Sequence, residues 1–228
     1  MKPISPPQSL MELTADRIRE AIIVGELQLG SKVSEQRLAD ALSISRSPVR
    51  EALALLQIEG LVRIFPKRGT FVFTPDEKTV LDLCDHRVCL ESACLQMALD
   101  RAPDTLLGGM RQAMEDMHKA IRAKDAAAYA LADMRFHRAI VTSSGNLSMA
   151  RVYGSTIGPL MALRTHLFTE MHADNQISMD QHAALLAACE AGDIQQGQAI
   201  IERHVRMLAD HYRRSRESAV QPPQSPVT

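Results

Sequence analysis

Apolar residues recur at helical spacing in three stretches near the start of the chain. The first stretch runs from Leu10 to Val24, and Gly25 follows it at a position where a helix can end. The second begins at Ser34, which is suited to cap a helix, and its apolar face carries Leu38 and Leu42 at i, i+4 spacing. In the third stretch the positions expected to face inward are Val49, Leu53 and Leu56, with Ile58 as a further candidate.

The pattern changes to short β-type runs after Gly60. Residues Leu61–Ile64 and Thr70–Phe73 are apolar or β-branched, and between them lies Phe65-Pro66-Lys67-Arg68-Gly69. Two such runs around a segment that contains Pro and Gly predict a hairpin, and its tip is cationic. Three helices followed by a hairpin indicate a winged helix-turn-helix domain.

Serine and arginine gather at the opening turn of the third helix, which carries Ser45, Arg46, Ser47 and Arg50. We expect Ser45 or Ser47 to cap this helix. A recognition helix in the major groove presents its N-terminal residues to phosphates and base edges, and arginine can bind the O6 and N7 atoms of guanine. Arg46 and Arg50 are therefore expected to read sequence, with the hairpin tip in the minor groove. The alternative is a structural helical hairpin with a charged edge.

Beyond Thr74-Pro75-Asp76 the sequence shows no strand pattern, and capping and breaking residues divide it into about six helices. The predicted helices are Glu77–Arg101, Pro103–Lys124, Ala126–Thr142, Leu147–Glu170, Ile177–Ala191 and Ile194–Glu217. Gly158-Pro159 should kink or split the fourth of them. Short connections favour an antiparallel bundle. The predicted fold class is mostly α, with a winged helix-turn-helix domain over residues 8–75, an all-helical domain over 76–217 and a disordered tail over 218–228.

Charge and cysteine content narrow the class of protein. The formal net charge is −1, yet Ser43 to Pro75 carries five Lys or Arg residues against Glu51 and Glu59, so the cationic footprint is local. Four cysteines without a CxxC pair favour a reduced chain. No apolar run approaches the ~20 residues that cross a bilayer, so we expect a cytoplasmic protein without membrane contact.

A polar constellation recurs on the predicted bundle helices. Asp133 and His137 stand at i, i+4 on one helical face, and neighbouring Phe136 is expected to anchor in the core. His182 and His204 lie on two later helices beside apolar residues. Three imidazoles and one carboxylate suit a divalent ion such as zinc or nickel. A buried hydrogen-bonded polar cluster is the alternative interpretation.

The N-terminal motifs resemble a known family. SISRSPVREAL, EGLV and PKRGTFV resemble the DNA-binding domain of GntR-family transcriptional regulators over about residues 8 to 75. Gln36 stands where the family commonly has arginine, and Arg37 lies beside it. The DNA contacts that the resemblance implies, with these two added, are Gln36, Arg37, Ser45, Arg46, Ser47, Arg50, Lys67, Arg68 and Gly69.

The rest of the chain, about residues 77 to 212, resembles the FCD effector domain of the FadR subfamily. The resemblance rests on Arg87-x-x-Leu90-Glu91, D-x-x-x-F-H, SGN and H-x-x-L-L-x-A. It implies that Asp133, His137, His182 and His204 hold a divalent metal, beside which a small carboxylate effector binds. Gln181 departs from the Glu that often precedes the histidine of the last motif.

Arg87 is our first candidate for neutralising the effector, and Arg164 is the second. The alternative for Arg87 is an exposed i, i+4 pair with Glu91. Only 4% aromatic residues and no Trp argue against a stacking pocket for a large planar ligand, so a small organic acid fits better.

These features predict a transcriptional regulator, most simply a repressor that releases DNA when its effector binds. A homodimer is expected, because one winged helix reads one half-site of a pseudo-palindromic operator. Two alternatives remain at this point. One is a metal-dependent enzyme tethered to DNA, although HExxH is absent, and the other is a ligand-independent DNA binder with a structural metal.

Overall fold

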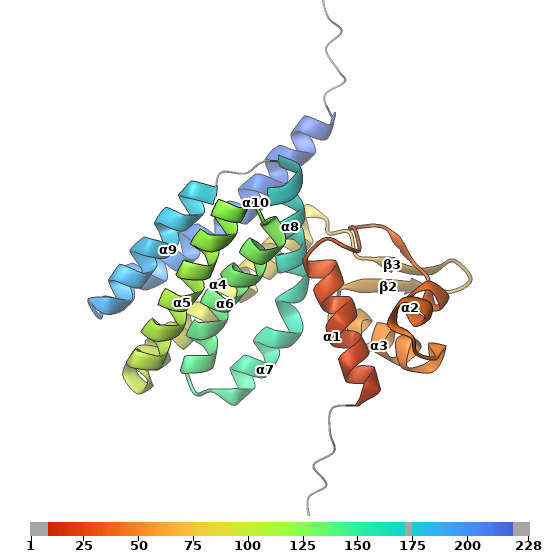
Figure 1. Cartoon of the computed structure of the whole chain (residues 1–228). Coiled ribbons are helices and arrows are strands. Elements are labelled where there is room, and N and C mark those ends of the chain that lie inside the picture. The colour runs from red at the N-terminus through yellow and green to blue at the C-terminus, as the bar shows by residue number, and fades with distance from the viewer. Residues whose placement is uncertain (1–8, 172–174, 221–228) are drawn as a thin grey trace, which may run out of the picture.

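The computed structural model describes residues 9–171 and 175–220 of the chain (Figure 1). The predicted mostly α fold class is confirmed, with a winged domain followed by a bundle of helices. Figure 1 shows the two parts side by side, with the hairpin of the small sheet extending away from the bundle. No helix among the described residues is long and apolar enough to span a membrane.

Three helices and a three-stranded sheet form the winged domain. Its elements are α1 (Leu10–Ile23), β1 (Lys32–Val33), α2 (Glu35–Leu42), α3 (Arg46–Ile58), β2 (Val62–Phe65) and β3 (Gly69–Val72). The sheet is antiparallel with strand order β1-β3-β2, and Phe65 pairs with Gly69 at the end of the predicted hairpin. Lys67 turns the tip with a φ of 61°. Strand β1 was not predicted, because two residues are too few to establish an alternating pattern.

Two local predictions for α3 are wrong. Ser45 is the N-cap residue by position, but its side chain makes no capping hydrogen bond, and the hydroxyl of Ser47 donates to Glu51 instead. The amides of the first turn of α3 are therefore not capped by Ser45. Ile58 is 85% exposed, whereas Leu53 and Leu56 are buried as expected, because Ile58 lies in the last turn of the helix beyond the core face.

The bundle contains seven helices in the described part of the chain. They are α4 (Glu77–Arg101), α5 (Pro103–Ala123), α6 (Ala126–Ser143), α7 (Leu147–Thr156), α8 (Gly158–Met171), α9 (Asn175–Glu190) and α10 (Ile194–Val220). The break between α7 and α8 falls at Gly158-Pro159, as predicted. The predicted tail begins at residue 218, whereas α10 continues to Val220, and the rest of that tail lies outside the described residues.

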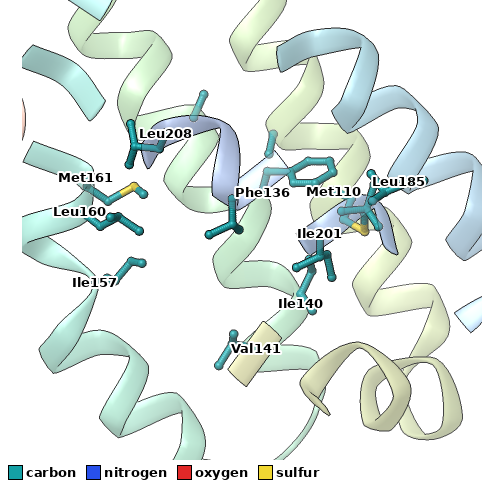
Figure 2. Close-up of a cluster of buried hydrophobic side chains, with 14 of the residues drawn as sticks. Met110, Phe136, Ile140, Val141, Ile157, Leu160, Met161, Leu185, Ile201 and Leu208 are labelled. Carbon is teal, nitrogen blue, oxygen red and sulfur yellow. The ribbon is translucent and has the colours of Figure 1, made fainter. Parts of the chain in front are cut away.

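The core of the bundle is a single apolar cluster in which Phe136 is fully buried, as expected (Figure 2). The labelled side chains around it in Figure 2 include residues of α5, α8, α9 and α10 as well as α6, among them Met110, Leu160, Leu185 and Ile201. This packing fixes the positions of α6, α9 and α10 relative to one another.

Each domain contributes a buried residue to the core of the other. Ile23 of α1 belongs to the bundle cluster, and Ala162 of α8 belongs to the winged-domain cluster. A Cβ added to Gly158 would lie 3.0 Å from the side chain of Leu61, so α8 and the winged domain approach closely there. Beside this contact a cleft of about 510 Å³ separates α1 from α6, α7 and α8, and Tyr153 is among its lining residues.

Two leucines test this description of the core. Leu53→Ala should destabilise the protein by about 2 to 5 kcal/mol, because Leu53 is 1% exposed and its loss leaves a cavity. The control Leu147→Ala removes the same atoms from a side chain that is 79% exposed, and we expect a change below about 0.5 kcal/mol. Urea denaturation measures both. Equal losses would show that the winged-domain core is wrongly described.

Candidate metal centre and DNA-binding surface

Four buried side chains from three helices converge in the bundle. Asp133 and His137 come from α6, His182 from α9 and His204 from α10. One donor atom from each of these residues lies within 4.8 Å of the others. The structure thus brings together the four residues of the sequence-predicted metal set, which are separated by up to 71 positions in the chain.

Hydrogen bonds on the outer side of the cluster fix the tautomers of two imidazoles. The Nδ1 atom of His137 lies 2.8 Å from Oε2 of Glu91, and Nδ1 of His204 lies 2.8 Å from Oε1 of Gln181. Both oxygens can only accept. The amide oxygen of Gln181 carries no proton, and Glu91 is ionised: burial would raise its pKa, but the charge of Arg87 and the contacts with His137 and Tyr153 together outweigh burial and lower the pKa to about 2. Each Nδ1 therefore carries the proton, and each Nε2 presents a lone pair to the centre.

The lone pairs point at one another. The Nε2 atom of His137 lies 3.1 Å from Nε2 of His204 and 3.2 Å from Nε2 of His182. The contact between His137 and His204 places two unprotonated nitrogens at hydrogen-bond distance without a proton between them, although Nη1 of Arg164 also lies 3.3 Å from Nε2 of His204. A cation between the nitrogens would turn this repulsion into attraction.

The spacing fits a shared metal ion. Nitrogen ligands about 2.1 Å from one ion lie ~3.0 to ~3.4 Å from each other in octahedral and tetrahedral arrangements. The distances between the imidazole nitrogens fall in that range, and Oδ1 of Asp133 lies 3.0 Å from Nε2 of His182. Among the described residues, neither carboxylate oxygen of Asp133 has a hydrogen bond of good geometry, although Nη2 of Arg164 lies 2.9 Å from Oδ1. The donor set therefore suits a divalent ion.

The ionisation states agree with metal binding. Burial lowers the pKa of His182 to about 4 and takes the pKa of His204 well below its usual value, and it also lowers that of His137. Burial alone would raise the pKa of Asp133, but the charge of Arg164 and the contacts with His182 and His137 together outweigh burial, and the pKa is lowered. At neutral pH the centre therefore offers three neutral imidazoles and one carboxylate, the forms that bind metal.

Most of the predicted DNA contacts are exposed side chains of the winged domain. Exposed side chains at the start of α3 are Ser45, Arg46, Ser47 and Arg50, those on α2 are Gln36 and Arg37, and those at the tip of the wing are Lys67 and Arg68. Gly69 has a φ of 107°, a conformation that favours glycine. The Arg68 guanidinium lies 5.6 Å from the centroid of the Phe65 ring, so the aromatic face supports one cation of the wing.

Comparison with known proteins now places the chain. The family "Bacterial regulatory proteins, gntR family" matches residues 10–72, and the FCD domain matches residues 82–207. This chain belongs to the GntR family and carries an FCD domain.

Several relatives and one solved structure support the assignment. A regulator from an unstable DNA locus of Streptomyces ambofaciens is 28% identical over 88% of this chain and 84% of its own length. The gluconate operon transcriptional repressor of Bacillus licheniformis is 29% identical over 78% of this chain and 75% of its own length. The E. coli protein McbR/YncC has the same fold, with a TM-score of 0.82, 19% identity and coverage of 92% of this chain and 100% of its own. The named relatives are transcriptional regulators and repressors, so this GntR protein is a regulator and not an enzyme.

Three polar residues of the GntR protein support the centre without belonging to the predicted metal set. Glu91 bonds His137 with one oxygen, and its other oxygen accepts from Arg87 at 2.6 Å and from the hydroxyl of Tyr153 at 2.6 Å. Gln181 supports His204 despite its departure from the usual Glu, because its amide oxygen can accept the same hydrogen bond. From the sequence, Glu91 is expected only as a possible i, i+4 partner of Arg87, and no sequence signal indicates Tyr153, whose partner is 62 positions away.

The alternative of an exposed pair between Arg87 and Glu91 is wrong in one respect. The pair forms, but the side chains are 1% and 0% exposed. Removal of Arg87 would leave a buried carboxylate without its charge partner, at a cost of about 3 to 5 kcal/mol. Arg164 is also buried, and it reaches Asp133, the hydroxyl of Ser178 at 2.8 Å and Nε2 of His204 at 3.3 Å. The two candidate arginines therefore flank the histidine cluster.

Purified protein should carry about one divalent ion per chain, and His204→Ala should lose most of it. The control is His118→Ala, because His118 is exposed on α5 and lies outside the cluster. Elemental analysis of both variants measures the contrast. Equal metal content in the two variants would rule out His204 as a ligand.

Proposed function

We propose that this GntR regulator is a repressor whose affinity for its operator is set by a small carboxylate bound at a divalent metal ion. The ion, zinc or nickel, would be held by Asp133, His137, His182 and His204. The observation that carries the proposal is the 3.1 Å contact between the two unprotonated Nε2 atoms of His137 and His204. FCD domains are metal-binding effector domains, which supports the same interpretation.

Charge balance favours an anionic effector. Within the centre, Asp133 and Glu91 offset the charges of Arg164 and Arg87, so the double charge of the ion would remain uncompensated in a buried place. A carboxylate effector supplies the opposite charge. Nη2 of Arg87 is buried and has no hydrogen-bond partner in the described part of the chain, so it offers a donor to such a ligand. The named relatives include repressors of a gluconate operon, and gluconate carries a carboxylate.

Helix α8 is our candidate for transmitting the signal. Its Arg164 lies in the centre, its Ala162 is buried in the winged-domain core, and its Gly158 lies against Leu61. A ligand that draws the Arg164 guanidinium away from Asp133 would therefore act on a helix that is packed into the DNA-binding domain. An effector that prefers one arrangement of this helix must change operator affinity by the same coupling free energy.

The winged domain would bind DNA as one half of a homodimer that recognises a pseudo-palindromic operator. Arg46 and Arg50 would read bases, and the remaining predicted contacts on α2, α3 and the wing would bind phosphates and the minor groove. The protein would act in the cytoplasm, where bacterial DNA lies.

Two substitutions test the DNA-binding assignment. Arg46→Ala should lower discrimination between an operator and a random duplex by about 1 to 3 kcal/mol, the value of a bidentate contact between arginine and guanine. Lys67→Ala should instead weaken binding to both duplexes evenly and lower the salt slope by about one unit. Binding isotherms at several salt concentrations provide both quantities. An unchanged specificity ratio for Arg46→Ala would remove Arg46 from the reading residues.

Arg87→Lys tests the effector site more cleanly than alanine would, because lysine keeps a positive charge beside Glu91. We expect near-normal metal content and operator affinity, but at least about a tenfold higher concentration of gluconate, or of the active member of a panel of short carboxylates, for operator release. Arg101→Lys is the control, since Arg101 lies on the same helix and bonds the carbonyl of Ser144. A normal response from Arg87→Lys would exclude Arg87 from the site.

Chelation separates this proposal from a ligand-independent regulator with a structural metal. If the ion serves the effector, its removal should abolish the response to the carboxylate while circular dichroism still reports a folded bundle. Unfolding of the bundle on chelation, together with no response to any carboxylate in the panel, would favour a structural ion.

A further inference from the structure

One carboxylate on α2 binds both of the arginines that are proposed to read DNA. Oε2 of Glu35 lies 3.0 Å from Nη2 of Arg46 and 3.0 Å from Nη2 of Arg50, and Oε1 lies 3.4 Å from Nε of Arg50. Arg50 therefore donates to Glu35 from two nitrogens, and Arg46 donates from one. These hydrogen bonds lower the pKa of Glu35, with the larger contribution from Arg50 and the smaller from Arg46, so the carboxylate is ionised at neutral pH.

This arrangement differs from the other polar pairs in the same region. Gln36 bonds Asp40, and Ser47 bonds Glu51, each four residues apart within a single helix. Glu35 instead joins two helices, across 11 and 15 positions of the chain. It is also the first residue of α2, where the helix dipole favours a negative charge.

The pairs are unlike those that hold a fold together. The arginine side chains are 54% and 66% exposed, and exposed ion pairs contribute little to stability. Their outer faces remain accessible to DNA while the inner faces are fixed by the carboxylate. The effect of Glu35 should therefore be seen in binding rather than in folding.

We propose that Glu35 is a positioning residue that determines sequence specificity, because it orients Arg46 and Arg50 and withholds their charge from phosphates. The inference rests on the proposed function, in which these arginines read bases. On random DNA the carboxylate repels the backbone and competes for the guanidinium groups, which weakens binding. On the operator it holds each guanidinium in the orientation that two hydrogen bonds to guanine require.

Three variants distinguish orientation from charge. Glu35→Gln removes the negative charge with little change in shape, and Glu35→Asp keeps the charge but shortens the reach by one methylene group. The matched control is Asp40→Asn, which removes a charge from the exposed side of the same helix and keeps an oxygen for the amide of Gln36. Full-length wild type is first used to select its preferred duplex from a random pool, and all proteins are then titrated with that duplex and with an unselected one.

We expect Glu35→Gln to bind the unselected duplex more tightly, with a salt slope larger by about one unit, and to lose about tenfold in the ratio of the two affinities. Glu35→Asp should lose specificity while its affinity for the unselected duplex stays near that of wild type. Asp40→Asn should keep the wild-type ratio. A ratio within twofold of wild type for Glu35→Gln, or an equal loss for Asp40→Asn, would overturn the role of Glu35 while leaving the regulator intact. Wild type that selects no sequence from the pool would overturn the proposed function and this inference with it.

Discussion

The unfavourable contact between the Nε2 lone pairs of His137 and His204 is the physical constraint on which the arrangement of the surrounding bundle depends. Glu91 and Gln181 each accept a hydrogen bond from the Nδ1–H of a histidine, so neither ring can turn its N–H toward the other. The apolar packing around Phe136 holds α6, α9 and α10 in place, which keeps the nitrogens close. This arrangement is unfavourable for core stability alone, because burying an apolar cluster of similar volume would cost less desolvation free energy. The polar centre is therefore best understood as a site prepared for a cation.

The same centre is mechanically close to the DNA-binding domain. Arg164 and Ala162 are two positions apart on α8, yet one contacts the carboxylate of Asp133 and the other is buried in the winged-domain core. A second connection runs through α10, which carries both His204 and Tyr212. The hydroxyl of Tyr212 donates to the carbonyl of Pro75 in the linker at 2.7 Å. Two helices that carry groups of the centre thus also hold the winged domain or the linker. Rigid helices of this kind can convey a small displacement at the site to the domain boundary.

Local signals in the sequence were sufficient for most of the helices. Asp76 and Asp125 cap α4 and α6, Pro103 opens α5, and Gly158 marks the break before α8. Features that depend on contacts distant in sequence were missed or misjudged. Strand β1 is defined by its pairing with the distant strand β3. The pair of Arg87 and Glu91 at i, i+4 resembles a surface pair in the sequence, but tertiary packing buries it. Spacing alone cannot report the environment of a charge. The same limit hid Tyr153 and the link from Glu35 to α3.

The buried charges of the centre make the stability of the fold depend on what is bound there. Arg87, Glu91, Asp133 and Arg164 are all at most 4% exposed, and each ion is costly to remove from water even when it is paired. Part of that cost is offset by hydrogen bonds within the protein, and the remainder can be offset by ligands that bind only the folded state. An ion present at a hundred times its dissociation constant stabilises the fold by about 2.7 kcal/mol. The stability of the bundle should therefore depend on the concentration of the ion that binds at the centre, to which α9 and α10 contribute one histidine each. Because Tyr212 of α10 also bonds the linker carbonyl of Pro75, the proposed coupling between this centre and the DNA-binding domain would need no separate signalling element.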